Sequence, residues 1–131
     1  MKKFLIYGAL IFTFFSCSNN SESIIKQKSI IGKWVWTKSS GGISGGTLTP
    51  SSTGKSIVIE ISNLEVKILE NGNVSSNNPY SIETKESIFG GQRQMMVYAL
   101  GKPSQSFSVV GDKLFLNDEC HDCYQSEYVK R

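Results

Sequence analysis

The chain has 131 residues, which is enough for one small domain with its own core. It carries 14 Lys and Arg residues against 11 Asp and Glu residues, a net charge of +3. A chain this close to neutral lacks the strongly basic surface that nucleic-acid binding requires, so we exclude nucleic acid as a partner.

The first residues carry the pattern of a secretory signal. Lys2 and Lys3 give a basic start, residues 4–15 form an almost unbroken apolar run, and Ser16-Cys17 follows. The run is shorter than the roughly 20 apolar residues of a transmembrane helix. Its apolar-small-cysteine ending resembles the lipobox of bacterial lipoproteins. The resemblance predicts cleavage directly before Cys17, and diacylglycerol and acyl chains such as palmitate on that cysteine.

Residues 1–16 are therefore predicted to be a cleaved signal peptide, and residues 17–29 a lipidated cysteine with a short flexible tether. Removing Lys2 and Lys3 leaves 12 basic and 11 acidic residues, a net charge of +1. The lipid on Cys17 is expected to hold the protein on a membrane of the cell envelope. By resemblance to sorted lipoproteins, Ser18 after the cysteine favours the outer membrane.

Residues 30–131 are predicted to form one all-β domain. Short runs of alternating apolar and polar residues are separated by turn signals, and no segment has the period of a helix. If Ser62-Asn63 is a two-residue hairpin loop, one face of the two flanking strands is wholly apolar. The predicted cross-strand pairs on this face are Ile61 with Leu64, Ile59 with Val66, and Ile57 with Ile68.

A second hairpin is predicted around Gly111-Asp112, a pair suited to positive φ angles. It pairs Val109 with Leu114 and Phe107 with Leu116 on one face. Other turns are predicted at Asn71-Gly72, Asn77-Asn78-Pro79, Gly90-Gly91 and Gly101-Lys102-Pro103. Eight or nine short strands in sequence order predict a small antiparallel up-and-down barrel of about eight strands.

The Asn71-Gly72 hairpin leaves the direction of Val74 open. A two-residue loop pairs Val74 with Leu69 on the outer face, whereas a bulge in the strand could return Val74 to the core.

Both ends of the domain resemble a known family. Gly32-Lys33-Trp34 opens the first expected strand and resembles the Gly-x-Trp signature of lipocalins. The chain ends in Tyr-x-Lys-Arg, similar to the Tyr-x-Arg ending of small bacterial lipocalin-like lipoproteins. The resemblance implies a lipocalin-like, calycin-type barrel whose floor is closed by Gly32 and Trp34, with a basic side chain across the indole. The spacing points to Lys130, whereas the chemistry points to Arg131 one place later.

The same resemblance gives residues 39–54, a Gly-rich segment, the role of a loop that covers the open end of the barrel. Ile43 and Leu48 would dip into the mouth, and a plain flexible loop is the alternative. The expected ligand-lining residues are all apolar: Ile57, Ile59, Ile61, Leu64, Val66, Ile68, Phe107, Val109, Leu114 and Leu116. Such a lining suits a small hydrophobic ligand, and equally a core filled by its own side chains.

Cys120 and Cys123 remain as a pair once Cys17 is lipidated. Because disulfides persist in exported proteins, we expect these two thiols to form one. A thioredoxin-like redox site is the alternative, although it normally requires a βαβ setting. A zinc site is disfavoured because neighbouring residues on an extended chain point apart.

The sequence contains no motif typical of an enzyme. His121 is the sole histidine, and we find no phosphate loop, nucleophile elbow or dinucleotide fingerprint. We therefore expect no catalytic residues, no cofactor and no metal. Two hypotheses follow. The first is a lipid-anchored lipocalin-like protein of the envelope that binds a small apolar ligand. The second is a non-enzymatic module with a filled core, similar to small periplasmic hydrolase inhibitors, which binds another envelope protein.

Overall fold

The computed structural model describes residues 29–131, so the predicted signal peptide, the lipidation site Cys17 and residues 18–28 of the tether lie outside the described residues. Nine strands and the short helix α2 follow one another along the described chain. They are β1 (Gly32–Gly41), β2 (Gly46–Leu48), α2 (Pro50–Thr53), β3 (Ile57–Ile61), β4 (Glu65–Glu70), β5 (Asn73–Glu86), β6 (Gln92–Tyr98), β7 (Gln105–Val110), β8 (Lys113–Asp118) and β9 (Tyr124–Lys130).

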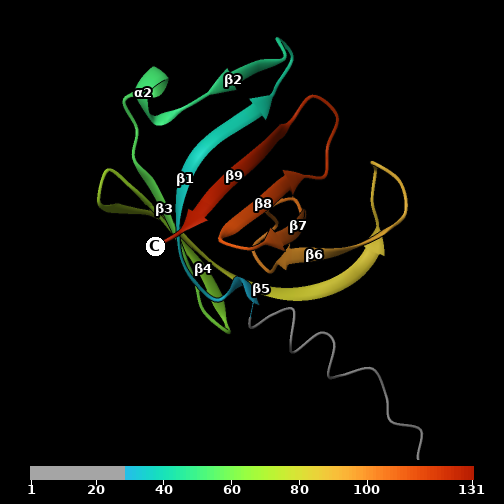
Figure 1. Cartoon of the computed structure of the whole chain (residues 1–131). Coiled ribbons are helices and arrows are strands. Elements are labelled where there is room, and N and C mark those ends of the chain that lie inside the picture. The colour runs from blue at the N-terminus through green and yellow to red at the C-terminus, as the bar shows by residue number, and fades with distance from the viewer. Residues whose placement is uncertain (1–28) are drawn as a thin grey trace, which may run out of the picture.

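Eight of the strands form a closed antiparallel barrel (Figure 1). The order β1-β3-β4-β5-β6-β7-β8-β9 follows the sequence, and β9 pairs with β1 to close the ring. β2 lies outside this ring and pairs with the last residues of β1. The predicted all-β, up-and-down barrel is confirmed, and its architecture is compatible with a lipocalin-like fold.

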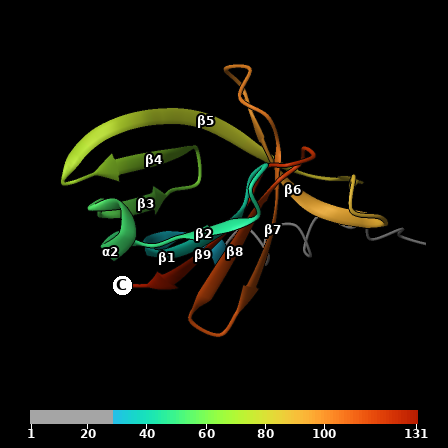
Figure 2. The ribbon, with the colours of Figure 1, turned by 90° about the horizontal axis from the view of Figure 1, so that it is seen from above.

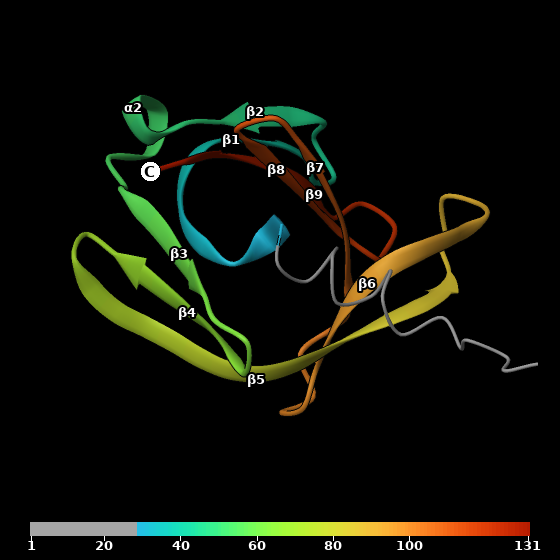
Figure 3. The same cartoon turned by 60° about the horizontal axis from the view of Figure 1, so that its bottom comes forward.

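Side chains from the inner faces of the strands fill the barrel. We call its end at Trp34 the floor, and its end beneath β2 and α2 the mouth. Figure 3 shows the beginning of the described chain lying inside the ring of strands, where Ile30 is fully buried. The core consists of Ile30, Trp34, Trp36, Ile59, Ile61, Val66, Met96, Tyr98, Leu114, Leu116 and Tyr128.

Trp34 closes the floor. Its side chain is fully buried, and its indole Nε1 donates a hydrogen bond of 2.7 Å to the carbonyl of Ile30. The Lys130 ammonium lies 5.4 Å from the centre of the Trp34 ring, within reach of a cation–π interaction. Gly32 begins β1 beside Lys130, at a φ of 139°. The basic side chain across the indole is thus Lys130, while Arg131 lies exposed beyond the end of β9.

The hairpin of β3 and β4 has a different register from the predicted one. The observed pairs are Ile61 with Val66, Ile59 with Ile68, and Ile57 with Glu70, so the predicted pairing was wrong by two residues. The turn is wider because the Ser62 hydroxyl accepts the N–H of Glu65 at 3.1 Å and caps a longer loop. A shift of two residues keeps the same strand faces inward. Only Leu64 changes place, since it lies in the turn and is 77% exposed.

The hairpin of β7 and β8 has the predicted register, with Val109 opposite Leu114 and Phe107 opposite Leu116. The Asn71-Gly72 turn is also confirmed. Its φ angles of 52° and 82° are both positive, as in a type I′ turn. The adjacent bulge falls after Val74, which therefore remains on the outer face opposite Leu69 and is 60% exposed.

The turn predicted at Asn77-Asn78-Pro79 is wrong, because β5 runs through it without interruption. Figure 2 shows β5 as one long curved strand that passes from β4 to β6. Pro79 pairs with Glu65, the first residue of β4, and β5 pairs with β6 from Tyr80 onward. A missing N–H is tolerated at such a point, where the strand changes its partner.

The Gly-rich segment 39–54 is folded rather than a plain loop. β1 continues to Gly41, and β2 returns along it. Helix α2 follows, with Thr49 as its N-cap and Gly54 as its left-handed C-cap. We call residues 46–55 the cover. Of the two residues expected to dip into the mouth, Leu48 lines it, whereas Ile43 is 95% exposed at the hairpin tip.

Candidate functional site

A cavity of about 400 Å³ lies at the mouth of the barrel and is open to solvent. We call it the mouth pocket. Strands β1, β3, β7, β8 and β9 form its walls, and the cover forms one side. Its lining consists of Trp36, Ser39, Leu48, Thr53, Lys55, Ile57, Gln105, Asp118, Tyr124, Ser126 and Tyr128.

Aromatic side chains on β1 and β9 form the apolar part of the mouth pocket. Trp36 and Tyr128 lie opposite each other across the two strands and are 5% and 8% exposed. The Trp36 indole donates to the hydroxyl of Ser39 at 2.8 Å, and the Ser39 and Ser126 hydroxyls share a hydrogen bond of 2.6 Å. Burial raises the pKa of Tyr128 to about 12, so its phenol is neutral at physiological pH. This wall is therefore hydrogen-bonded and uncharged.

A chain of hydrogen bonds forms the polar part of the pocket. The Tyr98 hydroxyl donates to Gln105 Oε1 at 2.6 Å, and Gln105 Nε2 donates to Asp118 Oδ1 at 2.7 Å. Burial raises the pKa of Tyr98, which keeps its hydroxyl protonated as the donor that starts the chain. Because both bonds run in one direction, they fix the Gln105 amide and hold the Asp118 carboxylate in one position.

The cover contributes one apolar and two polar side chains to the pocket. Leu48 on β2 is 38% exposed, and Thr53 donates its hydroxyl to the carbonyl of Thr49 at 2.8 Å. The ammonium of Lys55 forms an ion pair of 3.0 Å with Glu70, the last residue of β4. The charge of Lys55 is thus engaged on the barrel rim.

The residues expected to line a ligand site are distributed over several places. Ile59, Ile61, Val66, Leu114 and Leu116 are buried in the core, and Ile68 packs against it. Ile57 lines the mouth pocket, whereas Phe107 and Val109 line a second pocket in the barrel wall. The wholly apolar lining expected from the sequence is therefore not found at the mouth.

The polar residues of the mouth pocket were missed, although the alternation of β7 and β8 contains the signal for them. Asp118 continues the inward series of Leu114 and Leu116, and Gln105 precedes Phe107 by two residues. Continuing the inward-outward alternation of each strand by one more step of two residues would have placed both polar side chains inside the barrel.

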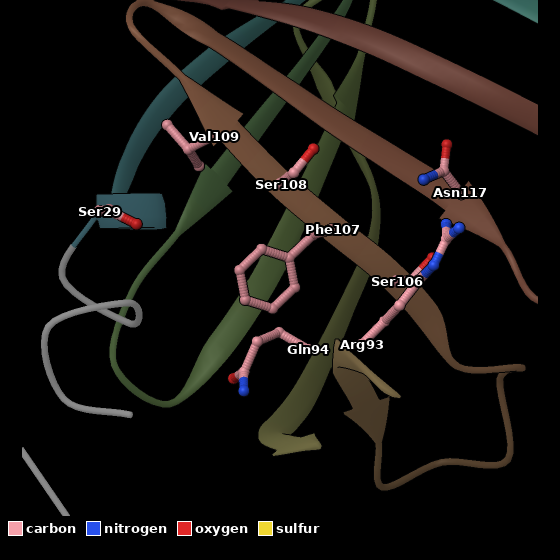
Figure 4. A pocket seen from close by; sticks show the side chains of 8 residues that line it. All are labelled: Ser29, Arg93, Gln94, Ser106, Phe107, Ser108, Val109 and Asn117. Atoms are coloured by element: carbon pink, nitrogen blue, oxygen red, sulfur yellow. The ribbon is translucent and has the colours of Figure 1, made fainter. Parts of the chain in front are cut away.

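The second pocket, of about 440 Å³, lies where β6 separates from β7 (Figure 4). We call it the wall pocket. Within the described chain, β6 pairs with β7 at only two positions, Met95 with Ser106 and Met96 with Gln105. The gap beyond them is lined by Ser29, Arg93, Gln94, Ser106, Phe107, Ser108, Val109 and Asn117. One side of the wall pocket is thus formed by Ser29, the first residue that the structure describes. The residues that line the mouth pocket all lie between positions 36 and 128.

The hairpin tip between β5 and β6 is clasped by Glu119, just after β8. The Glu119 carboxylate accepts hydrogen bonds from the Ser87 hydroxyl at 3.0 Å and from the Ile88 N–H at 2.9 Å. Burial alone would raise the pKa of Glu119. The Ile88 N–H, the Ser87 hydroxyl and the charge of Arg93 act in the opposite direction, and the pKa of Glu119 is lowered overall.

Replacing Glu119 with Gln should lower the free energy of unfolding by about 1–2 kcal/mol at pH 7, because hydrogen bonds to a charged acceptor are lost. A carboxyl group whose pKa is lower in the folded than in the unfolded chain stabilises the fold at pH values above its ordinary pKa of 4.5. This stabilisation is lost as the pH falls through the lower pKa of the folded state. Urea unfolding at pH 7 and pH 3 should thus show a difference between wild type and Glu119→Gln that shrinks in acid. The exposed Glu83→Gln serves as a matched control. A difference that stays constant with pH would show that the Glu119 carboxylate does not stabilise the hairpin tip through its charge.

The loop between β8 and β9 contains a disulfide between Cys120 and Cys123. The end of β1 lies against this loop, and the N–H of Gly42 donates to the carbonyl of Cys123 at 3.3 Å. The disulfide therefore stabilises the rim of the mouth next to the β1–β2 hairpin.

Comparison with protein families, with curated proteins and with solved structures finds no match for this chain. Among residues 29–131, no three His, Cys, Asp or Glu side chains gather as a metal site would require. In the same part of the chain, no helix has the length and apolar character needed to cross a bilayer. The functional conclusion rests on the geometry of the barrel.

Proposed function

We propose that this protein is a lipid-anchored binding protein of the cell envelope that holds a small ligand in the mouth pocket of its barrel. The observation that carries the proposal is the mouth pocket itself. It combines buried aromatic side chains, a fixed polar wall and a folded cover in a cavity of about 400 Å³. Sites for small molecules are typically concave, partly apolar and equipped with a few well-placed polar groups.

The lining favours an amphipathic ligand over a purely apolar one. Trp36 and Tyr128 offer apolar surface, while Asp118 carries a carboxylate charge that an alkane-like ligand would cover without replacing the water around it. Below this level, Leu114 and Leu116 are at most 2% exposed, so the ligand occupies the mouth rather than the whole barrel.

The anchor in this proposal is the diacylglycerol expected on Cys17, which would keep the barrel close to a membrane, most simply the outer membrane. The support is the basic-apolar-cysteine pattern of the first 17 residues. No reaction is part of the proposal, in line with the lack of enzyme motifs in the sequence.

One mass-spectrometric experiment tests the ligand and the anchor together. The full chain is expressed in the organism from which it comes and is purified from the cell envelope in mild detergent. Under denaturing conditions, we expect the mass of residues 17–131 plus the lipid. Under native conditions, we expect a further mass that organic extraction removes. An unlipidated mass would overturn the anchor.

Three variants locate the ligand. Leu48→Trp should block the mouth pocket and abolish the added native mass, because Leu48 lies on the cover beside the opening. Leu100→Trp is the matched control, since Leu100 is 70% exposed in the β6–β7 loop and lines neither pocket. Ser108→Trp fills the wall pocket instead. Loss of the added mass in Ser108→Trp alone would place the ligand in the wall pocket and contradict the proposal.

A second candidate function, binding of an envelope protein by the loops, is favoured by two observations. The barrel is filled by its own side chains between the floor and the mouth pocket, and Ile43 is 95% exposed at the tip of the β1–β2 hairpin. A protein without added mass, whose cross-linked partner is lost in Ile43→Ser, would support this function over ligand binding.

A further inference from the structure

Asp118 places a carboxylate in the lining of the mouth pocket. Asp118 ends β8 and faces the pocket, continuing the inward series of Leu114 and Leu116. It accepts a hydrogen bond of 2.7 Å from Gln105. Within the described chain, Asp118 takes part in none of the ion pairs.

Two lysines lie near this carboxylate. Lys55 pairs with Glu70 at 3.0 Å on the rim. The ammonium of Lys102 lies 4.5 Å from the centre of the Tyr98 ring, outside the lining of the pocket. Burial lowers the pKa of Lys102, and the charge of the nearby Asp118 raises it, so the two charges interact. Among the residues that line the pocket, Asp118 is the acidic one and Lys55 the basic one, and Lys55 is already paired with Glu70.

Aromatic rings lie in the same pocket as this carboxylate. Trp36 and Tyr128 are buried on adjacent strands, and Tyr124 lines the rim at 38% exposure. The electron-rich faces of aromatic rings attract organic cations, most strongly where water is excluded. A carboxylate beside aromatic rings is complementary to an ammonium group with apolar substituents, and it disfavours an anion.

We propose that the mouth pocket binds a small organic ammonium ion, whose charge pairs with Asp118 and whose apolar part contacts Trp36 and Tyr128. The inference rests on the proposed function, because it names the class of ligand for the same pocket. Gln105 acts as the positioning residue, since it holds the Asp118 carboxylate in place from the adjacent strand β7.

Three probes of one shape separate charge from shape: choline is cationic, 3,3-dimethylbutan-1-ol is neutral and 3,3-dimethylbutanoate is anionic. The protein is the full mature chain in a maltoside detergent, followed through its indole N–H signals by NMR. Trp36 reports on the mouth, and Trp34 at the floor serves as an internal control. Trp36→Phe assigns the two signals.

We expect choline to shift the Trp36 signal saturably and to leave Trp34 unchanged. The neutral probe should bind at least about tenfold more weakly, and the anion more weakly still. Asp118→Asn should weaken choline binding about tenfold without affecting the neutral probe, because it removes the charge and keeps the shape. Asp122→Asn in the exposed disulfide loop is the matched control and should behave as wild type.

The outcomes separate this inference from the proposed function. Equal binding of all three probes, or choline binding unchanged in Asp118→Asn, would overturn the ammonium site while leaving the mouth pocket as a binding site. If no probe shifts Trp36 although the native mass carries a ligand lost in Leu48→Trp, the ammonium class is wrong and the proposed function stands. If no probe shifts Trp36 and the native mass carries no ligand, both proposals fall.

Discussion

Replacing Trp34 with alanine should lower the free energy of unfolding by about 4 kcal/mol, the range found for large aromatic-to-alanine changes in a core. Trp34 is fully buried, closes the floor and donates a hydrogen bond to Ile30. Its removal leaves a cavity under the core and an unpartnered carbonyl. Since small domains are stable by only about 5–15 kcal/mol, the variant should be close to unfolding at ordinary temperature. Urea unfolding followed by circular dichroism measures the change.

A second variant separates packing from the hydrogen bond. Trp34→Phe keeps most of the apolar surface but loses the indole N–H, so we expect a loss of about 1–3 kcal/mol, due chiefly to the unsatisfied carbonyl of Ile30. Lys130→Met removes the charge across the ring and should cost no more than about 1 kcal/mol. If Trp34→Ala and Lys130→Met were equally mild, Trp34 would not be the closure of the barrel.

Replacing Gly41 with alanine should lower the free energy of unfolding by about 3 kcal/mol. Gly41 has a φ of 128°, which side-chain-bearing residues rarely adopt, and an added Cβ would overlap the carbonyl oxygen of Cys123. The backbone of either β1 or the disulfide loop must move to accommodate it. Thermal unfolding of wild type and variant gives the measurement.

Gly45 in the same hairpin is the matched control. Its φ is 64°, and nothing lies within 4 Å of an added Cβ. Gly45→Ala should therefore cost only the left-handed backbone strain of about 1 kcal/mol. Equal losses for Gly41→Ala and Gly45→Ala would mean that the close approach to Cys123 does not constrain the rim of the mouth.

The two ends of the barrel differ in chemistry although the same strands build them. The inner face of β8 carries Leu114 and Leu116 in the core and Asp118 at the mouth, and β9 carries Tyr128 toward the core and Ser126 at the mouth. The floor is closed by Trp34, whereas the mouth remains an open pocket. Function is therefore expected at the mouth and stability at the floor, which is why the Trp34 variants test folding and the Asp118 variant tests binding.

Local patterns in the sequence determined the fold class, the inward faces of most strands and the turns at Asn71-Gly72 and Gly111-Asp112. These features depend on period-two alternation and on φ preferences, which act between near neighbours. The tight turn at Gly111-Asp112 also determined the register of its hairpin. At Ser62-Asn63 this inference failed, because a serine side chain caps a longer turn and moves the register by two residues.

Only the tertiary structure decided the remaining features. Pro79 ended in a continuous strand because β5 changes partner there, and the Gly-rich segment after β1 became a cover because β2 and α2 fold back over the rim. Closure of the ring brought β1 beside β9, and so placed Trp36 in one pocket with Asp118 from β8. Residues more than 80 positions apart meet there through the pairing of the whole sheet, and no pattern within a single strand contains that information.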